Sequence, residues 1–310
     1  MRALVTGAAG FIAPHIARRL ADAGHTVFGV DDFSNGRREN VPPGIELIVQ
    51  DLSDPGGMAK LPGSIDVILH LAGQASGENS FRDPVDDLNR NTTTTINLIR
   101  YGIDAGAQRF VFASSMSCYG DVPTDHVAET EPCRPLSCYA NAKLAAEGYL
   151  RILANRLPYV IFRIFNVYGP GQNLDNMRQG MISIYLAQAL HDGTVKVKGS
   201  LDRFRDFIEV EDVVEAWMRA ATSDRADGQT LNLGTGQGTT VRRVLEVLRQ
   251  HIDGMDWYVE GSTPGDQFGL RADVSRLKSV LDFEPRIDIE TGIPRFVDWA
   301  RAQITTQGAL

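Results

Sequence analysis

Three side chains near the middle of the chain have the types and spacing of a proton-transfer site. Tyr139 and Lys143 are four residues apart, which places them on one face of a helix. A lysine ammonium beside a phenol favours the phenolate, so we expect Lys143 to lower the pKa of Tyr139 and make it a base near neutral pH. Ser115 follows the apolar run Arg109–Ala113 and is placed to hold a substrate hydroxyl in line with the tyrosine oxygen. The alternative is a pair of neighbours on an exposed helix surface.

The elements that have to position these side chains begin at the N-terminus. An apolar run, Met1–Val5, is followed by the glycine-rich stretch T-G-A-A-G-F-I-A and then by an apolar helix face, an order typical of dinucleotide-binding sites. Gly7 permits the tight turn, and Gly10 lets the backbone approach a pyrophosphate at the helix N-terminus. The third glycine position holds Ala13, followed by Pro14. We therefore expect the pyrophosphate turn to be slightly altered. The alternative is a tight turn that binds no ligand.

An acid follows the second predicted strand, Thr26–Val30. Asp31 lies 21 residues beyond Gly10, near the distance expected of the acid that binds the adenosine ribose. It favours NAD, because the 2′-phosphate of NADP would meet a like charge. Arg37 and Arg38 lie nearby, however, so the sequence is also compatible with NADP. Capping of a solvated loop is the alternative for this acid.

The next two predicted strands also end in polar residues. Ile45–Val49 is followed by Asp51, which is placed to accept from the adenine amino group, with an ordinary loop acid as the alternative. Ile65–Leu71 is closed by Ala72–Gln74, and we expect His70 within it to be a core histidine rather than a catalyst.

Predicted strands and helices alternate through the first half of the chain. The remaining ones are helices at Pro84–Gly102 and Tyr139–Asn155 and strands at Arg109–Ala113 and Tyr159–Ile164. This alternation predicts an α/β fold of the Rossmann type, a doubly wound parallel sheet with helices on both faces and ligands at the carboxyl ends of its strands.

The sequence pattern changes beyond Tyr168–Gly171, where turns lengthen and glycines interrupt the helices. We expect residues 1–165 to form an NAD-binding domain and residues 166–310 to form mainly a smaller, interleaved C-terminal substrate-binding lobe. Segments near 207–235 and the helix near Val241–His251 are expected to return to the main body.

Composition excludes several classes of function. The 310 residues carry a net charge of −8, with a pI of about 5.3, which argues against a nucleic-acid partner. No apolar run has the length of a membrane span, and the N-terminus begins a strand rather than a signal peptide. Cys118, Cys133 and Cys138 are too few for a disulfide framework and lack metal-ligand spacing. We therefore expect a cytoplasmic protein with no metal, in which Cys118 packs as a small hydrophobe.

Together these motifs resemble the extended short-chain dehydrogenase/reductase family, in its nucleotide-sugar epimerase/dehydratase group. The resemblance covers nearly the whole chain and is closest to UDP-sugar 4-epimerases. Besides the residues above, it rests on Asp83-Pro84 with Asn91, on R-I-F-N-V-Y-G-P-G over Arg163–Gly171, on Arg205–Ile208 with Glu211–Val214, and on Pro264–Asp266 with Ala272-Asp273.

The resemblance implies a tightly held NAD, a nucleoside-diphosphate sugar as substrate, and a homodimer. Tyr139 would be the base, Lys143 would bind the nicotinamide ribose, and Ser115 would orient the sugar 4-hydroxyl. The implied cofactor contacts are Gly7, Gly10, Phe11, Ile12, Asp31, Asp32, Asn35, Asp51, Leu52, Leu71, Ala72, Gly73, Gln74, Asn91, Tyr139 and Lys143. The implied substrate contacts are Ser115, Met116, Ser117, Asn166, Met181, Arg205 and Arg271.

Two of these arginines carry qualifications. Arg205 matches a residue that contacts the diphosphate, a role suited to a guanidinium, with pairing to Asp202 or Asp206 as the alternative. The family often has a basic residue beside Pro264–Asp266, where this chain has Thr263 and Phe268, so Arg271 is the nearest substitute.

The residues after Ser115 bear on the type of reaction. The related 4,6-dehydratases have Asp-Glu there as acid and base, whereas this chain has Met116 and Ser117, which cannot do that chemistry. We therefore expect NAD-dependent 4-epimerisation of a UDP-hexose or UDP-hexuronic acid through a 4-keto intermediate. The alternatives are a dehydratase or decarboxylase that shares the first oxidation, and a non-catalytic NAD-binding sensor or scaffold, for which a tuned phenolate would have no use.

Overall fold

A seven-stranded parallel sheet forms the main body of the protein in a computed structural model that describes residues 1–177, 180–261 and 268–307. The strand order is β12-β7-β5-β4-β1-β2-β3, and every neighbouring pair is parallel. The strands are β1 (Arg2–Thr6), β2 (Thr26–Asp31), β3 (Glu46–Val49), β4 (Val67–His70), β5 (Arg109–Ser115), β7 (Tyr159–Ile164) and β12 (Gln229–Leu233). The Rossmann-type fold expected from the sequence is confirmed. The order reverses at β1, so a crevice opens between the ends of β1 and β4.

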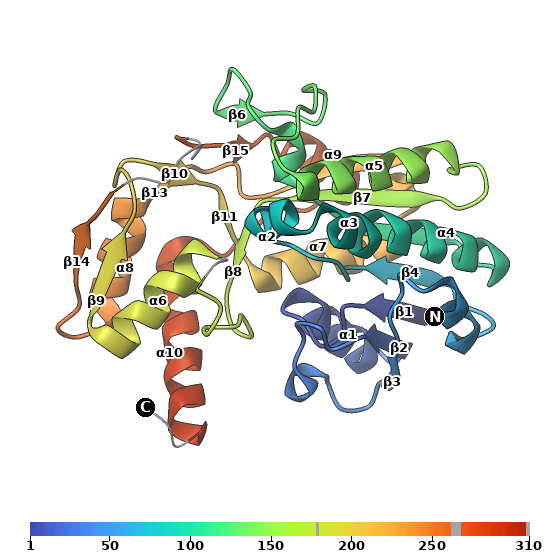
Figure 1. Cartoon of the computed structure of the whole chain (residues 1–310), viewed down its shortest axis with the longest axis horizontal. Helices are drawn as coiled ribbons and strands as arrows, with labels where there is room; N and C mark the ends of the chain where they lie inside the picture. The colour runs from blue at the N-terminus through green and yellow to red at the C-terminus, as the bar shows by residue number, and fades with distance from the viewer. Residues whose placement is uncertain (178–179, 262–267, 308–310) are drawn as a thin grey trace.

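Helices cover both faces of this sheet (Figure 1). Their bounds are α1 (Ile12–Asp22), α2 (Gly77–Arg82), α3 (Pro84–Leu88), α4 (Thr94–Asp104), α5 (Cys138–Ile152), α7 (Val210–Thr222) and α9 (Ser275–Leu281). The single helix predicted over Pro84–Gly102 is in fact α3 and α4 joined by a π-helical turn, Asn89–Thr93. One extra residue per turn changes which side chains face the sheet, and hydrophobic periodicity does not reveal such a turn.

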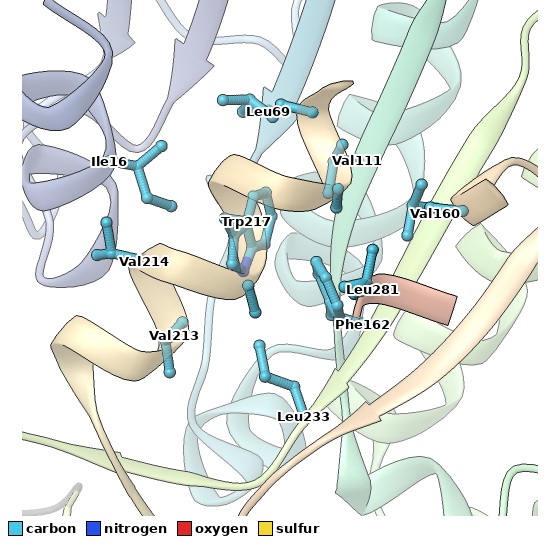
Figure 2. Close-up of a cluster of buried hydrophobic side chains, with 14 of the residues drawn as sticks. Ile16, Leu69, Val111, Val160, Phe162, Val213, Val214, Trp217, Leu233 and Leu281 are labelled. Atoms are coloured by element: carbon cyan, nitrogen blue, oxygen red, sulfur yellow. The ribbon is translucent and has the colours of Figure 1, made fainter. Parts of the chain in front are cut away.

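Alternate residues of the strands pack against different helices, because successive side chains in a strand point to opposite faces. Val111 of β5 lies in a cluster with α1, α7 and α9, whereas Phe110 and Phe112 lie in a cluster with α4 and α5. Figure 2 shows Trp217 of α7 at the centre of the first cluster, with its ring 5.5 Å from that of Phe162. The sheet is therefore packed on both faces, and this packing holds the residues at the ends of its strands in place.

A second, smaller lobe follows the sheet and has its own apolar core (Figure 1, left). It contains α6 (Met181–Asp192), α8 (Val241–His251), α10 (Ile289–Gln307) and the parallel pair β9 (Thr194–Val197) and β14 (Asp256–Val259). Short strand pairs connect the parts: β8 (Asn166–Tyr168) with β11 (Phe207–Glu209), β10 (Phe204–Arg205) with β13 (Thr239–Thr240), and β6 (His126–Val127) with β15 (Arg271–Ala272).

The returning segments differ in part from expectation. β12 joins the main sheet and α7 packs beside α1, as expected. The prediction for α8 is wrong, because Val244 and Leu248 are buried in the core of the smaller lobe. Instead α9 returns, and its Leu277 and Leu281 are buried in the Trp217 cluster. Period alone marks α8 as amphipathic but does not say which core its apolar stripe meets.

The described part of the chain contains neither a candidate membrane span nor a cluster of metal-ligating side chains. None of its helices combines the length and the apolar character needed to cross a membrane. Within the same residues, no three His, Cys, Asp or Glu side chains are grouped in a way that would hold a metal ion.

Candidate active site

A cavity of about 1050 Å³ runs along the carboxyl ends of the strands and under the smaller lobe. Most residues predicted for the cofactor and the substrate line it: Gly7, Gly10, Phe11, Ile12, Asp31, Asp32, Asn35, Asp51, Leu52, Leu71, Ala72, Gly73, Gln74, Ser115, Ser117, Tyr139, Lys143, Asn166 and Met181. Four predicted residues, Asn91, Met116, Arg205 and Arg271, are not among the lining residues.

The glycine-rich turn lies at one wall of this cavity. Gly7 has φ of +74°, and a side chain there would meet the backbone nitrogen of Ala72 at 3.0 Å, so the position accepts only glycine. The N–H of Gly10 donates to the carbonyl of Gly7 at 2.9 Å and closes the turn. Ala13 and Pro14 are buried in the first turn of α1, so the departure from a third glycine is accommodated without breaking the helix. The free N–H groups that begin α1 form a cradle suited to a pyrophosphate.

Carboxylates gather at the end of the cavity reached by β2 and β3. Asp31 accepts from the N–H groups of Ala9 (2.9 Å) and Phe33 (2.8 Å). Asp51 accepts from the backbone and hydroxyl of Ser53 at 2.8 and 2.7 Å. Both acids therefore cap their own loops while they line the cavity, so the two roles weighed from the sequence are compatible in geometry.

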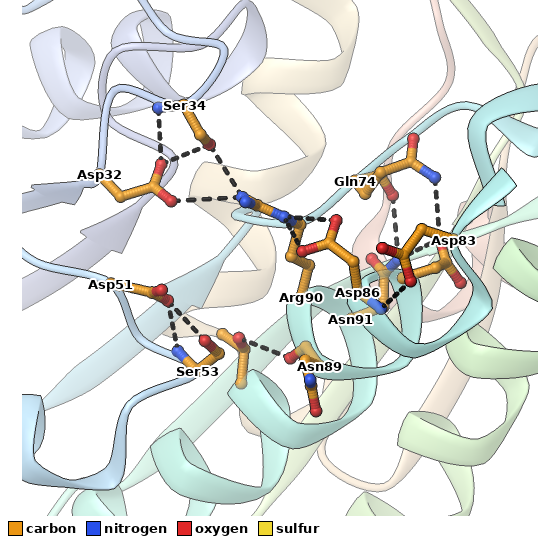
Figure 3. Close-up of polar contacts among 12 residues, drawn as sticks. Asp32, Ser34, Asp51, Ser53, Gln74, Asp83, Asp86, Asn89, Arg90 and Asn91 are labelled. Carbon is orange, nitrogen blue, oxygen red and sulfur yellow. Dashed lines mark hydrogen bonds and ion pairs between the residues drawn. The ribbon is translucent and has the colours of Figure 1, made fainter.

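Arg90 is a cavity residue that the sequence did not indicate. Figure 3 shows its guanidinium between α3 and the loop after β2. It donates to Asp86 of α3 at 2.8 and 2.9 Å. On the loop, it donates to Ser34 at 3.0 Å and lies 3.3 Å from Asp32. No motif marks it, because its contacts with Asp32 and Ser34 are with residues 58 and 56 positions away in the sequence, which only the fold brings close.

Arg37 and Arg38, the two arginines that could have bound the 2′-phosphate of NADP, contact other side chains. Arg37 binds Asp175 and lies 3.3 Å from the side-chain oxygen of Asn173, and Arg38 stacks 5.0 Å from the centre of the Phe33 ring. The end of the cavity reached by β2 and β3, where we expect the adenosine and which we call the adenosine end, therefore keeps an acidic character.

At the other end, β5 and α5 bring the proposed proton-transfer residues together. Ser115 is the last residue of β5, and its hydroxyl accepts from the N–H of Ser117 at 3.1 Å. Ser137 caps α5 by accepting from Ala140, which places Tyr139 in the first turn. The ammonium of Lys143 lies 5.9 Å from the centre of the Tyr139 ring.

The electrostatics of this pair correct one expectation. Burial raises the pKa of Tyr139 well above its usual value, and the hydrogen bond with Ser115 offsets this only in part. We expected Lys143 to lower that pKa, but burial also lowers the pKa of Lys143, to about 8. Both groups lose hydration in the same pocket, and desolvation disfavours each charged form. In the chain by itself the phenol is therefore a weak acid.

His70 and Cys118, whose residue types often take part in catalysis, are packed into the core, as expected. His70 is buried, with hydrogen bonds to the hydroxyls of Thr6 (2.8 Å) and Thr95 (3.1 Å), and burial lowers its pKa. Cys118 is fully buried, and burial raises the pKa of its thiol to about 12. A thiol that stays protonated at neutral pH is a poor nucleophile or base.

The substrate residues divide into two groups. Asn166 lines the cavity, and its amide donates to the carbonyl of Asp206 at 3.0 Å. Met116 packs with the apolar cluster around Tyr119. Arg271, on β15, lies 3.8 Å from the carboxylate of Asp125, away from the lining residues.

Arg205 donates to the carbonyl of Phe204 at 2.7 Å. The acids considered as its partners serve other groups. Asp202 pairs with Arg242, and the Asp206 carboxylate accepts from Thr235, Gly236 and Ala272. The motif Pro264–Asp266 and Thr263 lie outside the described residues.

Comparison with known proteins places this geometry in a family. The model of the "NAD dependent epimerase/dehydratase family" matches residues 3–234. The UDP-glucose 4-epimerase of Mycolicibacterium smegmatis is 35% identical over 97% of this chain and 99% of its own.

Solved structures agree with this. The UDP-glucose 4-epimerase of Thermotoga maritima with UDP-glucose superposes with a TM-score of 0.92, at 32% identity, over 98% of this chain and all of the other. The Thermus thermophilus UDP-glucose 4-epimerase complex with NAD gives a TM-score of 0.87, at 34% identity, over 97% and 99% of the two chains. With the glycine cradle, the acidic end and the Ser115, Tyr139 and Lys143 set all on one cavity, this chain belongs to the NAD-dependent epimerase/dehydratase family.

Proposed function

We propose that the protein is an NAD-dependent 4-epimerase of a UDP-sugar, a UDP-hexose or UDP-hexuronic acid. The observation that carries the proposal is the set of side chains that line the cavity beside Ser115. Tyr139 and Lys143 line it there, and the acidic lining residues within the described ranges lie instead at the adenosine end, around Arg90, or on the 173–177 loop. Among the described residues, this end of the cavity has a base for a hydroxyl proton but no lining carboxylate that could eliminate water.

The residues of the chain fit the cofactor of the family. The cradle at Gly7 and Gly10 suits the pyrophosphate, and Asp31 suits the adenosine ribose. NAD, when bound, would supply the acceptor and the donor of the hydride at C4 of the sugar. The chain supplies the rest: Ser115 orients the 4-hydroxyl, Tyr139 accepts and returns its proton, and Lys143 supplies a positive charge beside the tyrosine. A nicotinamide cation would add to that charge and oppose the raised pKa of Tyr139.

Epimerisation requires that the hydride return to the opposite face of C4, so the keto sugar has to turn about its diphosphate link. Firm contacts at the nucleotide and loose ones at the sugar allow this. Asn166, Met181 and Ser117 line the cavity and are proposed as substrate contacts. Arg205 is kept as a candidate for the diphosphate, on the strength of the family motif alone. Met116 and Arg271 are not proposed again, because they face other parts of the molecule.

We further propose a division of labour between the two parts of the chain. Residues 1–165, with the returning segments near 207–235, bind NAD, and residues 166–310 otherwise bind the nucleotide sugar. The separate apolar cores of the sheet and of the smaller lobe support this division. The cavity borders both parts, with β2 and β3 on one side and α6 on the other.

A homodimer working in the cytoplasm completes the proposal. Large apolar side chains are exposed on α2, α3 and the loop before α5: Phe81, Val85, Leu88 and Leu136, each with 46 to 67% of its surface accessible, and three of them, Phe81, Leu88 and Leu136, line one depression. An apolar face of this kind is typical of a protein contact, and a second copy of the chain is the occupant we propose. The composition and the three free cysteines agree with a reducing compartment.

The cofactor assignment predicts tighter binding of NAD than of NADP. The carboxylates of Asp31 and Asp32 would repel a 2′-phosphate, and Arg37 is already occupied by Asp175. Isothermal calorimetry with both cofactors measures the difference, and Asp31→Asn should narrow it. Equal or tighter binding of NADP by the wild type would show that Arg37 or Arg38 dominates this end.

Tyr139→Phe should reduce kcat by about 10²–10⁴-fold, the usual contribution of a general base, because the variant loses the phenolic oxygen but little volume. Binding of NAD by calorimetry should stay within about twofold, which would show that the fold is intact. Tyr149→Phe, on the exposed part of α5, is the matched control and should keep full activity. Near-normal turnover by Tyr139→Phe would refute its role as the base.

The reaction itself predicts a product of unchanged mass. With a panel of UDP-sugars, NMR should show the C4 epimer, and no net NADH should accumulate because each hydride is returned. In heavy water no deuterium should enter C5, which is never deprotonated. Loss of water or of carbon dioxide would indicate the dehydratase or decarboxylase instead. NAD binding without any turnover would favour a sensor.

The dimer predicts that Phe81→Asp sediments as a monomer where the wild type sediments as a dimer. A charge buried in an apolar contact is costly. Tyr258→Asp, at an exposed position of β14 outside the patch, should remain dimeric. A monomeric wild type at micromolar concentration would contradict the proposal.

A further inference from the structure

A buried carboxylate lies behind the catalytic lysine and has no role in the scheme above. Asp87, on α3, has only 1% of its surface accessible. Its Oδ1 accepts from the side-chain nitrogens of Gln74 (2.8 Å) and Asn91 (3.1 Å), two residues that Figure 3 shows close together. Its Oδ2 is buried without a hydrogen-bond partner in the described structure.

Asn91 connects this carboxylate to the lysine. Its amide nitrogen also donates to the backbone carbonyl of Gln74 at 3.1 Å, whereas its Oδ1 is buried and receives no hydrogen bond from any described residue. Gly73, with φ of +152°, leaves the space in front of it: a side chain there would lie 2.5 Å from Asn91 Oδ1 and 3.3 Å from Lys143 Nζ. Asp87, Asn91 and Lys143 are therefore in series, with an amide between the two charged groups.

Lys143 needs such a partner. It is 4% exposed and forms no hydrogen bond or ion pair with a described side chain, although an ammonium has three donors. Its ammonium lies 5.0 Å from the centre of the Phe112 ring, which supplies only a weak attraction.

The other titratable groups that act on Lys143 are neutral or become its partner in proton transfer. His70 and Cys118 have pKa values shifted by burial toward their neutral forms, lowered for the histidine and raised to about 12 for the thiol. Tyr139 is the phenol itself. Cys118 and Asp87 both oppose the larger effect of burial on the pKa of Lys143, and because burial keeps the thiol protonated, Asp87 is the carboxylate of the pair.

We propose that Asp87 is a positioning residue for the reaction: its carboxylate fixes Gln74 and Asn91 in the wall of the cavity and keeps Lys143 cationic. The role rests on the proposed function, because a cation at Lys143 matters only if Tyr139 acts as the base. Without Asp87 the ammonium would be buried beside an amide and two aromatic rings, with no negative charge to balance it.

The charge can be measured without any turnover. The chain has only five lysines, so protein labelled with ¹³C at lysine Cε gives few NMR signals, and Lys143→Arg identifies the one from position 143. In Asp87→Asn, the titration midpoint of Lys143 should fall by about one pH unit, the effect of losing a nearby opposite charge. Asp104→Asn, which removes an exposed carboxylate at the end of α4, should leave the midpoint unchanged. An unchanged midpoint in Asp87→Asn would overturn the proposal.

Kinetics give the second readout. Asp87→Asn should lower kcat about tenfold while KM for the UDP-sugar changes less than twofold. Both limbs of its pH profile should move to lower pH, because losing the negative charge lowers the pKa of Tyr139 as well as that of Lys143. A uniform loss of rate with both limbs in place would indicate a merely structural residue and would overturn the proposal. If the wild type epimerises no sugar, the proposed function fails, but the lysine titration still tests the role of Asp87.

A double variant guards against a folding defect. Asp87→Asn with Asn91→Asp exchanges the two side chains, so that an amide still faces a carboxylate and the negative charge moves closer to Lys143. The Lys143 midpoint should return to the wild-type value or rise above it. A midpoint that stays as low as in the single variant would contradict an electrostatic role. Circular dichroism of both variants verifies that they are folded.

Discussion

The active end of the protein depends on one buried ion pair, between Glu147 of α5 and Arg163 of β7. The two side chains meet through paired contacts of 3.0 and 2.8 Å, and Arg151 adds a third contact to the same carboxylate at 2.6 Å. Glu147 is fully buried. Burial by itself would raise its pKa, but the hydrogen bonds and charge of Arg163 outweigh burial and lower it. Removing one partner of such a pair costs about 3–5 kcal/mol, because the other is left as an uncompensated buried charge.

This pair fixes the geometry of the proton-transfer residues. Glu147 lies four residues after Lys143 and eight after Tyr139, so all three occupy one face of α5. The same carboxylate accepts from the hydroxyl of Ser114 at 2.5 Å, and Ser114 adjoins Ser115 at the end of β5. One interaction therefore sets both the rotation of the helix and the end of the strand, the two elements that hold Tyr139 and Ser115. Positioning of this precision is what a general base requires.

Charge is distributed unevenly along the cavity, and this suits a reaction in which the cofactor keeps its place. Carboxylates and their capping bonds lie at the adenosine end, with Arg90 joining the β2 loop to α3. The other end contains a phenol, an ammonium and hydroxyls, with Asp87 set back behind an amide. The π-helical turn at Asn89–Thr93 serves both ends, since it carries Arg90 toward one and Asn91 toward the other.

The sequence alone predicted the class of fold, the glycine turn, the acid after β2 and the three residues that we propose for proton transfer, Ser115, Tyr139 and Lys143. These follow from local patterns: alternation of strands and helices, glycine where φ is positive, and a four-residue spacing on a helix. It also indicated that His70 and Cys118 are core residues, because each lies in or beside an apolar strand.

Only the tertiary structure decided what depends on contacts between distant segments. It placed α8 in the smaller lobe and α9 in the main core, since an apolar stripe does not name its partner. It left Met116 and Arg271 out of the cavity lining and added Arg90 to it. It also reversed the expected pKa shift of Tyr139, because spacing reveals that a lysine is near but not how much water both groups have lost. Desolvation is a property of the assembled interior, and no short stretch of sequence contains it.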